Sequence, residues 1–121
     1  MRAQAAKADR VFIARADTNK PKSIIAALRL CPLGNSWLLR SMCVDQPFQR
    51  HGVGRQMLKL LKAELATTNC YCFAWSHLQD FYQQAGFSLI DIDQASDEIA
   101  NRFKQYADNN RDIQLMQFTG N

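Results

Sequence analysis

The chain has 121 residues, of which 47% are hydrophobic and 21% charged, and its formal net charge is +4. These values are typical of one globular domain spanning residues 1–121, and they exclude a disordered chain. No apolar run approaches the roughly 20 residues that cross a bilayer, so we expect no membrane partner. The basic residues are scattered and carry no recognition motif, so we also expect no nucleic-acid partner.

The first ten residues contain charges but no apolar stretch, which argues against a secretory leader and predicts a cytoplasmic location. The chain has four cysteines, Cys31, Cys43, Cys70 and Cys72. Their spacing is not that of zinc ligands, so we expect reduced cysteines, mostly buried, and no bound metal.

Three β-rich segments come first in the chain, over residues 10–17, 22–30 and 36–44. Short turns separate them, which predicts an antiparallel meander. After Pro47, apolar residues at helical spacing predict an amphipathic helix over residues 53–67. Shorter elements then alternate: strand 71–75, helix 78–85, strand 87–92, helix 96–107 and strand 113–118. This order predicts an α/β (α+β) fold with a mixed, mostly antiparallel sheet flanked by helices.

The loop before the amphipathic helix reads Gln-Arg-His-Gly-Val-Gly-Arg from Gln49 to Arg55. Amides in the first turn of a helix lack partners within the helix and form an anion site. Gly52 and Gly54 would let phosphate oxygens approach the backbone, while Arg50 and Arg55 add positive charge. The simpler interpretation is that the two glycines only shape the turn.

With its surroundings, this loop resembles the acetyl-coenzyme A motif of the GNAT superfamily of N-acetyltransferases, V-x-P-x-x-[QR]-[RG]-x-G-[IV]-[GA]. Val44 and the loop fit the motif, with Pro47 one place later than usual. Residues 81–87 resemble a second family signature, F-Y-x-x-x-G-F on a short helix. The two signatures have the expected order and spacing. The resemblance implies a GNAT-like sheet in which the central strands, 36–44 and 71–75, splay apart.

The resemblance also implies the activity, which is transfer of an acetyl group from acetyl-coenzyme A to a primary amine by direct attack. In the family, the pantetheine arm of the cosubstrate fills the gap between the splayed strands. The residues implied in cofactor binding are Met42, Cys43, Val44, Gln49, Arg50, His51, Gly52, Val53, Gly54, Arg55 and Ser76. The acceptor is a small-molecule or protein amine that the sequence does not identify.

Tyr82 matches the family tyrosine near the coenzyme sulfur and could protonate the leaving thiolate, or it could simply anchor its helix in the core. His77 is a candidate general base, but it could instead cap the helix or contact pantetheine. Arg40 could bind an acidic group on the acceptor or pair with an acid in the protein. The acids near the last helix could recognise a cationic amine or form a solvated surface. They are Asp91, Asp93, Asp97 and Glu98.

Two departures from the family favour an alternative function. Relatives usually carry a strand and two helices before the segment that matches residues 10–17, and neither central strand contains the glutamate that many relatives use as a base. The alternative is a non-catalytic acetyl-coenzyme A-binding regulatory protein that acts through a partner. An incomplete front would also expose sheet edge, which predicts a possible homodimer.

Overall fold

The computed structural model describes residues 9–15, 24–109 and 111–120, which form a six-stranded sheet in the order β1-β2-β3-β4-β6-β5. The strands are β1 (Arg10–Arg15), β2 (Ile24–Leu33), β3 (Ser36–Val44), β4 (Cys70–Trp75), β5 (Phe87–Leu89) and β6 (Ile113–Phe118). The helices are α1 (Val53–Leu60), α2 (Lys62–Thr67), α3 (Gln79–Gln84) and α4 (Asp97–Ala107). Short 3-10 turns are η1 (Gln46–Phe48), η2 (Ser76–Leu78) and η3 (Ile92–Gln94). Within the described residues, no helix is both long and apolar enough to cross a membrane.

The predicted order of elements and the mixed, mostly antiparallel sheet are confirmed, since only β3 and β4 pair in parallel among the described strands. Residues 16–17 and 22–23 of the predicted first hairpin lie outside the described residues. The helix predicted over residues 53–67 is divided at Leu61, which has φ −92° and ψ 6°. The strand predicted over residues 87–92 ends at Leu89. It is short because Asp91 and Gln94 form a capping box that starts η3.

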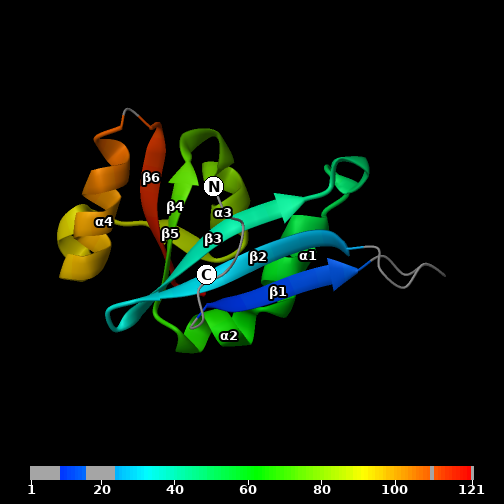
Figure 1. Ribbon diagram of the computed structural model, residues 1–121, viewed down its shortest axis with the longest axis horizontal. Coiled ribbons are helices and arrows are strands. Elements are labelled where there is room, and N and C mark those ends of the chain that lie inside the picture. The colour runs from blue at the N-terminus through cyan, green and yellow to red at the C-terminus, as the bar shows by residue number, and fades with distance from the viewer. Residues whose placement is uncertain (1–8, 16–23, 110, 121) are drawn as a thin grey trace.

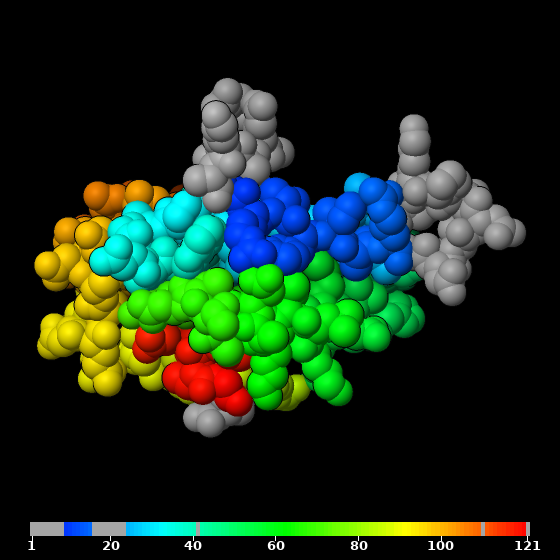
Figure 2. Space-filling view, turned by 90° about the horizontal axis from the view of Figure 1, so that it is seen from below, coloured from blue at the N-terminus to red at the C-terminus, as the bar shows by residue number. Residues whose placement is uncertain are grey.

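Each face of the sheet has its own hydrophobic core. On one face, α1, α2 and α3 pack Leu58, Leu65 and Tyr82 against the sheet. On the other face, Ile99 of α4 packs against Leu38 and other buried residues. Figure 2 shows α1 and α2 (green) lying between β1 (blue) and the last described residues of the chain (red). The two faces of the sheet are therefore covered by different helices.

β3 and β4 pair only at their beginnings. Their ladder consists of Trp37–Cys70, Leu38–Tyr71 and Leu39–Cys72, and beyond it the two strands diverge (Figure 1). The predicted splay of the central strands is therefore confirmed. Across the gap, the facing backbone edges of residues 40–44 and 73–75 have no ladder partner within the described part of the chain. Such edges can accept hydrogen bonds from an extended ligand.

A β-bulge reorients the free end of β3. Between the pairs Ala27–Cys43 and Arg29–Arg40, β2 has one residue and β3 has two. An extra residue on one strand of an antiparallel pair leaves the ladder locally disrupted and bends that strand. The bulge lies at the place where β3 leaves β4.

The bulge changes which side chains of β3 face which layer, because successive residues of a strand alternate between the two faces. Leu39 belongs to the core under α1 and α3, and Met42 and Val44 pack against that same core. Arg40 points to the opposite face, where its guanidinium lies 5.6 Å from the ring centroid of Tyr106 in α4. The splayed end of β3 therefore carries apolar groups on one face and a cation on the other.

Replacing Leu58 with Ala should lower the free energy of unfolding by about 2–5 kcal/mol, because its side chain is fully buried under the sheet. Leu60 lies two residues further along α1 and is 77% exposed, so Leu60→Ala should change the stability by less than about 0.5 kcal/mol. Urea denaturation of both variants measures the difference. Equal losses in the two variants would contradict the orientation of α1.

Candidate active site

The loop that leaves β3 is tied back to the end of the strand. Asp45 Oδ1 accepts a hydrogen bond of 3.2 Å from the amide of Gln46, which begins η1. Gln49 Nε2 donates a hydrogen bond of 2.9 Å to the backbone carbonyl of Val44. The side chain of Gln49 thus fixes the loop relative to the strand, and the carbonyl of Val44 already has one donor.

The loop enters α1 through two residues in the left-handed region, Arg50 (φ 67°) and Gly52 (φ 79°). Gly52 is the N-cap, and its carbonyl accepts the first intrahelical bond from the amide of Gln56 at 2.9 Å. The amides of Val53 and the two residues after it therefore have no acceptor within the helix. These amides and the helix dipole favour an anion at this end of α1.

The two loop glycines have different surroundings. A Cβ added at Gly52 would meet no atom within 4 Å, so this position is open as well as left-handed. A Cβ added at Gly54 would lie 3.0 Å from Met42 Cε and 3.2 Å from Phe81 Cζ. Gly54 is therefore required for close packing of α1 against β3 and α3, whereas Gly52 is required for the turn itself.

A cavity of about 580 Å³ lies between the end of β3, the loop and the start of α1. Its lining includes eight of the eleven predicted cofactor-binding residues: Met42, Val44, Gln49, Arg50, Gly52, Val53, Gly54 and Arg55. Tyr82 lines it as well. Three further lining residues, Phe48, Leu78 and Phe81, were not predicted. Phe81 is part of the second signature, but nothing in the local sequence marks Phe48 or Leu78.

Cys43, His51 and Ser76 are not among the described residues that line this cavity. Cys43 is exposed because strand alternation turns it away from the face of Met42 and Val44. His51 is exposed at the tip of the loop. The hydroxyl of Ser76 donates a hydrogen bond of 2.7 Å to Asp112 Oδ1, which joins the end of β4 to the start of β6. Their predicted contacts with the cofactor stay predictions.

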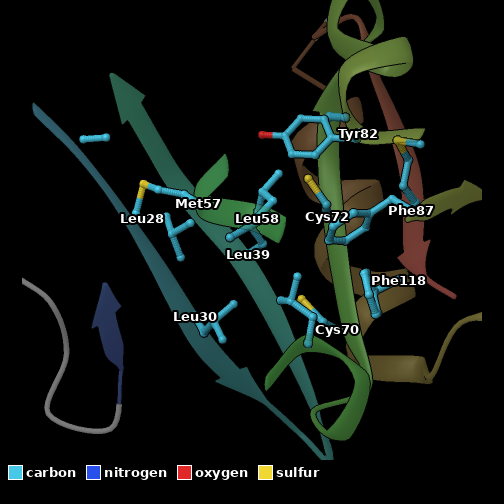
Figure 3. Packing of buried hydrophobic residues seen from close by; sticks show 14 residues of the cluster. Leu28, Leu30, Leu39, Met57, Leu58, Cys70, Cys72, Tyr82, Phe87 and Phe118 are labelled. Atoms are coloured by element: carbon cyan, nitrogen blue, oxygen red, sulfur yellow. The ribbon is translucent and has the colours of Figure 1, made fainter. Parts of the chain in front are cut away.

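A second cavity, of about 330 Å³, lies where β3 and β4 separate. It shares Met42, Leu78 and Tyr82 with the first cavity, so the two are neighbours. In Figure 3 the hydroxyl of Tyr82 points away from β4, toward the side on which β3 lies. Tyr82 thus stands where the two cavities meet.

Tyr82 is held in place by aromatic rings and burial. Its ring makes edge contacts with Phe81 and Phe87, at centroid distances of 5.0 and 5.7 Å. Burial raises the pKa of its hydroxyl above the ordinary value, and the neighbouring Cys72, which forms a side-chain hydrogen bond with it, raises it further. Tyr82 therefore keeps its proton at neutral pH and can act as a hydrogen-bond donor.

His77 is exposed in η2 and is not among the described residues that line either cavity. Neither set of lining residues contains a carboxylate or an imidazole. The structure therefore brings Tyr82, but not His77, to the walls of the cavities.

All four cysteines are free. Burial raises the pKa of the Cys70 thiol to about 12, and burial also raises the pKa of Cys72. A nucleophilic cysteine needs a lowered pKa, so neither thiol is suited to that role. Within the described ranges, no group of three or more His, Cys, Asp or Glu residues could hold a metal ion.

Taken together, the donors fit a long, anionic, extended ligand. One end offers helix amides, an open left-handed glycine and two arginines, which suit a pyrophosphate. The other end offers unpaired strand edges, which suit the amides of an extended arm. The buried hydroxyl of Tyr82 lies between these two ends.

The family model described as an acetyltransferase (GNAT) domain matches residues 7–89. The chain belongs to this family of acetyltransferases, and the resemblance inferred from its two signatures is confirmed. No curated protein matches the sequence.

Several solved structures share the fold. N-acetylglutamate synthase from Neisseria gonorrhoeae, in complex with coenzyme A and N-acetyl-glutamate, has a TM-score of 0.66 at 16% identity, covering 89% of this chain and 25% of that chain. Rv2747 from Mycobacterium tuberculosis, in complex with CoA and NLQ, has a TM-score of 0.66 at 17% identity, covering 89% and 74%. A putative N-acetyltransferase from Lactobacillus plantarum has a TM-score of 0.58 at 20% identity, covering 82% and 64%. This chain thus spans a quarter of the synthase and less than two thirds of the Lactobacillus protein.

Proposed function

We propose that this protein is an acetyl-coenzyme A-dependent N-acetyltransferase that acetylates a primary amine by direct attack on the thioester. The observation that carries the proposal is the arrangement of the two neighbouring cavities, one at the start of α1 and one between the parted strands, with Tyr82 lining both. The coenzyme A bound to two proteins of the same fold supports the same assignment.

In the proposed complex, Arg50, Arg55 and the first-turn amides of α1 bind the pyrophosphate of coenzyme A. Gly52 leaves room for the phosphate oxygens, because nothing lies within 4 Å of its would-be Cβ. Backbone groups of Met42 and Val44 hold the pantetheine amides along the free edge of β3. These contacts orient the thioester relative to the acceptor, which is the main contribution a direct transfer requires.

Acetyl-coenzyme A supplies the activated acetyl group as its thioester. Tyr82 Oη donates a hydrogen bond toward the sulfur, and this bond strengthens as negative charge develops there. The raised pKa of Tyr82 keeps the donor protonated across the neutral range. The acceptor amine loses its proton to water, because no described residue that lines either cavity is an acid or a histidine.

Isothermal calorimetry should detect saturable binding of acetyl-coenzyme A, and Arg55→Ala should weaken it roughly 10- to 100-fold through loss of a charged contact to phosphate. Lys59→Ala is the matched control: Lys59 is an exposed cation on the same helix, outside the cavity lining, and its loss should change the Kd less than about twofold. A folded protein that fails to bind, or equal effects of the two variants, would refute the proposed cofactor site.

Tyr82→Phe should lower kcat roughly 100-fold while leaving the Kd for acetyl-coenzyme A nearly unchanged, since it removes a donor that acts as the sulfur becomes charged. Thiol release with a panel of primary amines measures kcat. Tyr71→Phe removes a hydroxyl that contacts Gln117 and lines neither cavity, so its kcat should equal that of the wild type. If Tyr82→Phe retains full kcat, the tyrosine serves only to pack α3.

A further inference from the structure

The cavity between the parted strands has a positively charged wall on the α4 side of the sheet. The guanidinium carbons of Arg40 and Arg111 lie 5.6 and 5.1 Å from the ring centroid of Tyr106, and all three residues line this cavity. Arg40 comes from β3 immediately before the bulge, Tyr106 from the last turn of α4, and Arg111 from the segment before β6. Three separate elements therefore place two cations at one aromatic ring.

The aromatic ring is itself fixed by the core. Phe73 of β4 makes an edge contact with Tyr106 at a centroid distance of 5.5 Å, and a second edge contact with Phe103 at 5.3 Å. Cation–π contacts at these distances hold each guanidinium near the ring while leaving its N–H donors free for other partners. The arrangement is thus a preformed pair of donors at the wall of a cavity.

The charge of this pair is not balanced within the described residues. Neither Arg40 nor Arg111 forms an ion pair with a described residue. Asp112, the neighbour of Arg111 in sequence, accepts the hydrogen bond from Ser76. Asp9, on the same face as Arg40, pairs with Arg29 at 3.4 Å. Both guanidinium groups lie at the ring of Tyr106 and line the same cavity, so an anion bound there would be attracted by two positive charges.

The acids near the start of α4 lie elsewhere. Asp97 and Glu98 are in its first turn, and the nine-residue separation of Asp97 and Tyr106 corresponds to roughly 13 Å along the helix. None of the four acids considered in the sequence lines the cavity, and the side chain of Asp91 takes part in the capping box of η3. The charge at the cavity wall therefore suits an anionic group on the acceptor, not a polycation.

We propose that the acceptor is an amino acid, which is a small amine that carries a carboxylate, and that Arg40 and Arg111 bind this carboxylate. This inference rests on the proposed function. The cavity volume of about 330 Å³ is at the lower end of the range for small-molecule sites, and Tyr82 also lines this cavity. An acceptor anchored at the arginines would present its amine to the thioester beside Tyr82. Figure 1 shows that α4 ends and β6 begins beside the C-terminal end of β4, where the strands have parted.

The proposed step balances with the two substrates alone. The unprotonated amine nitrogen of the amino acid forms a bond to the acetyl carbonyl carbon, and the carbon–sulfur bond of the thioester breaks with its electron pair going to sulfur. The nitrogen loses one proton to water and the sulfur gains one. The products are an N-acetylated amino acid and free coenzyme A.

Thiol release from acetyl-coenzyme A, measured with amino acids and with their α-amides, tests the proposal. Each amide keeps the amine and side chain and lacks only the carboxylate charge, so kcat/KM for the preferred amino acid should exceed that of its amide roughly 10- to 100-fold. Arg40→Gln and Arg111→Gln should remove this preference, mainly by raising the KM for the amino acid. Arg102→Gln, which removes a cation of α4 outside the cavity lining, is the matched control.

Binding measurements distinguish failure of this inference from failure of the proposed function. Calorimetric titration of an N-acetyl amino acid, and of its amide, into the coenzyme A-loaded protein measures carboxylate recognition without turnover. Titration of acetyl-coenzyme A into each arginine variant verifies that the variant is folded. Carboxylate-dependent binding lost in both arginine variants supports the inference even if no amine is acetylated. The inference would be overturned if turnover and binding did not depend on the carboxylate. It would also be overturned if the protein preferred polyamines or amines that carry a phosphate. Either result would leave the proposed acetyl transfer intact.

Discussion

The parting of β3 from β4 after three residue pairs is the constraint on which the rest of the site depends. A continuous ladder would bury the edge of β3 against β4 and leave no space between them. Instead, β4 pairs with β6 as far as Trp75–Ile113, while β3 stays with β2 through Val44. The gap therefore lies between two well-paired halves of the sheet, and the hydrophobic core on each face contains residues from both halves. Stability resides on both sides of the gap, and backbone polar groups line the gap itself.

The bulge in β3 determines what each side of the gap offers. By shifting the alternation of side chains, it directs Met42 and Val44 to the face of α1 and α3, where Gly54 allows close approach. Arg40, on the other side of the bulge, meets Tyr106 of α4. One irregularity thus separates an apolar wall for an extended cofactor from a cationic wall that we assign to the acceptor. Tyr82 is buried at the junction of the two cavities.

Sequence patterns could predict the elements and the loop because their signals are local: spacing of apolar residues, turn residues and two short signatures. The bulge was not predictable, since it depends on a register between strands and no residue type marks it. Arg40 could be named as a candidate from the sequence, but its neighbours Tyr106 and Arg111 could not. These residues approach Arg40 only through the packing of α4 on the sheet. The cytoplasmic location and the possible homodimer stay predictions.

Hydrogen exchange with and without coenzyme A, read by mass spectrometry, tests most directly whether the cofactor lies in the gap. Binding there should slow exchange of amides in residues 40–44 and 49–55, because the first form new hydrogen bonds and the second are covered by phosphates. Amides of Phe87–Leu89, on the far edge of the sheet, should be unchanged. Protection confined to the separate cavity between β1 and α1, or no protection of the free end of β3, would contradict the account.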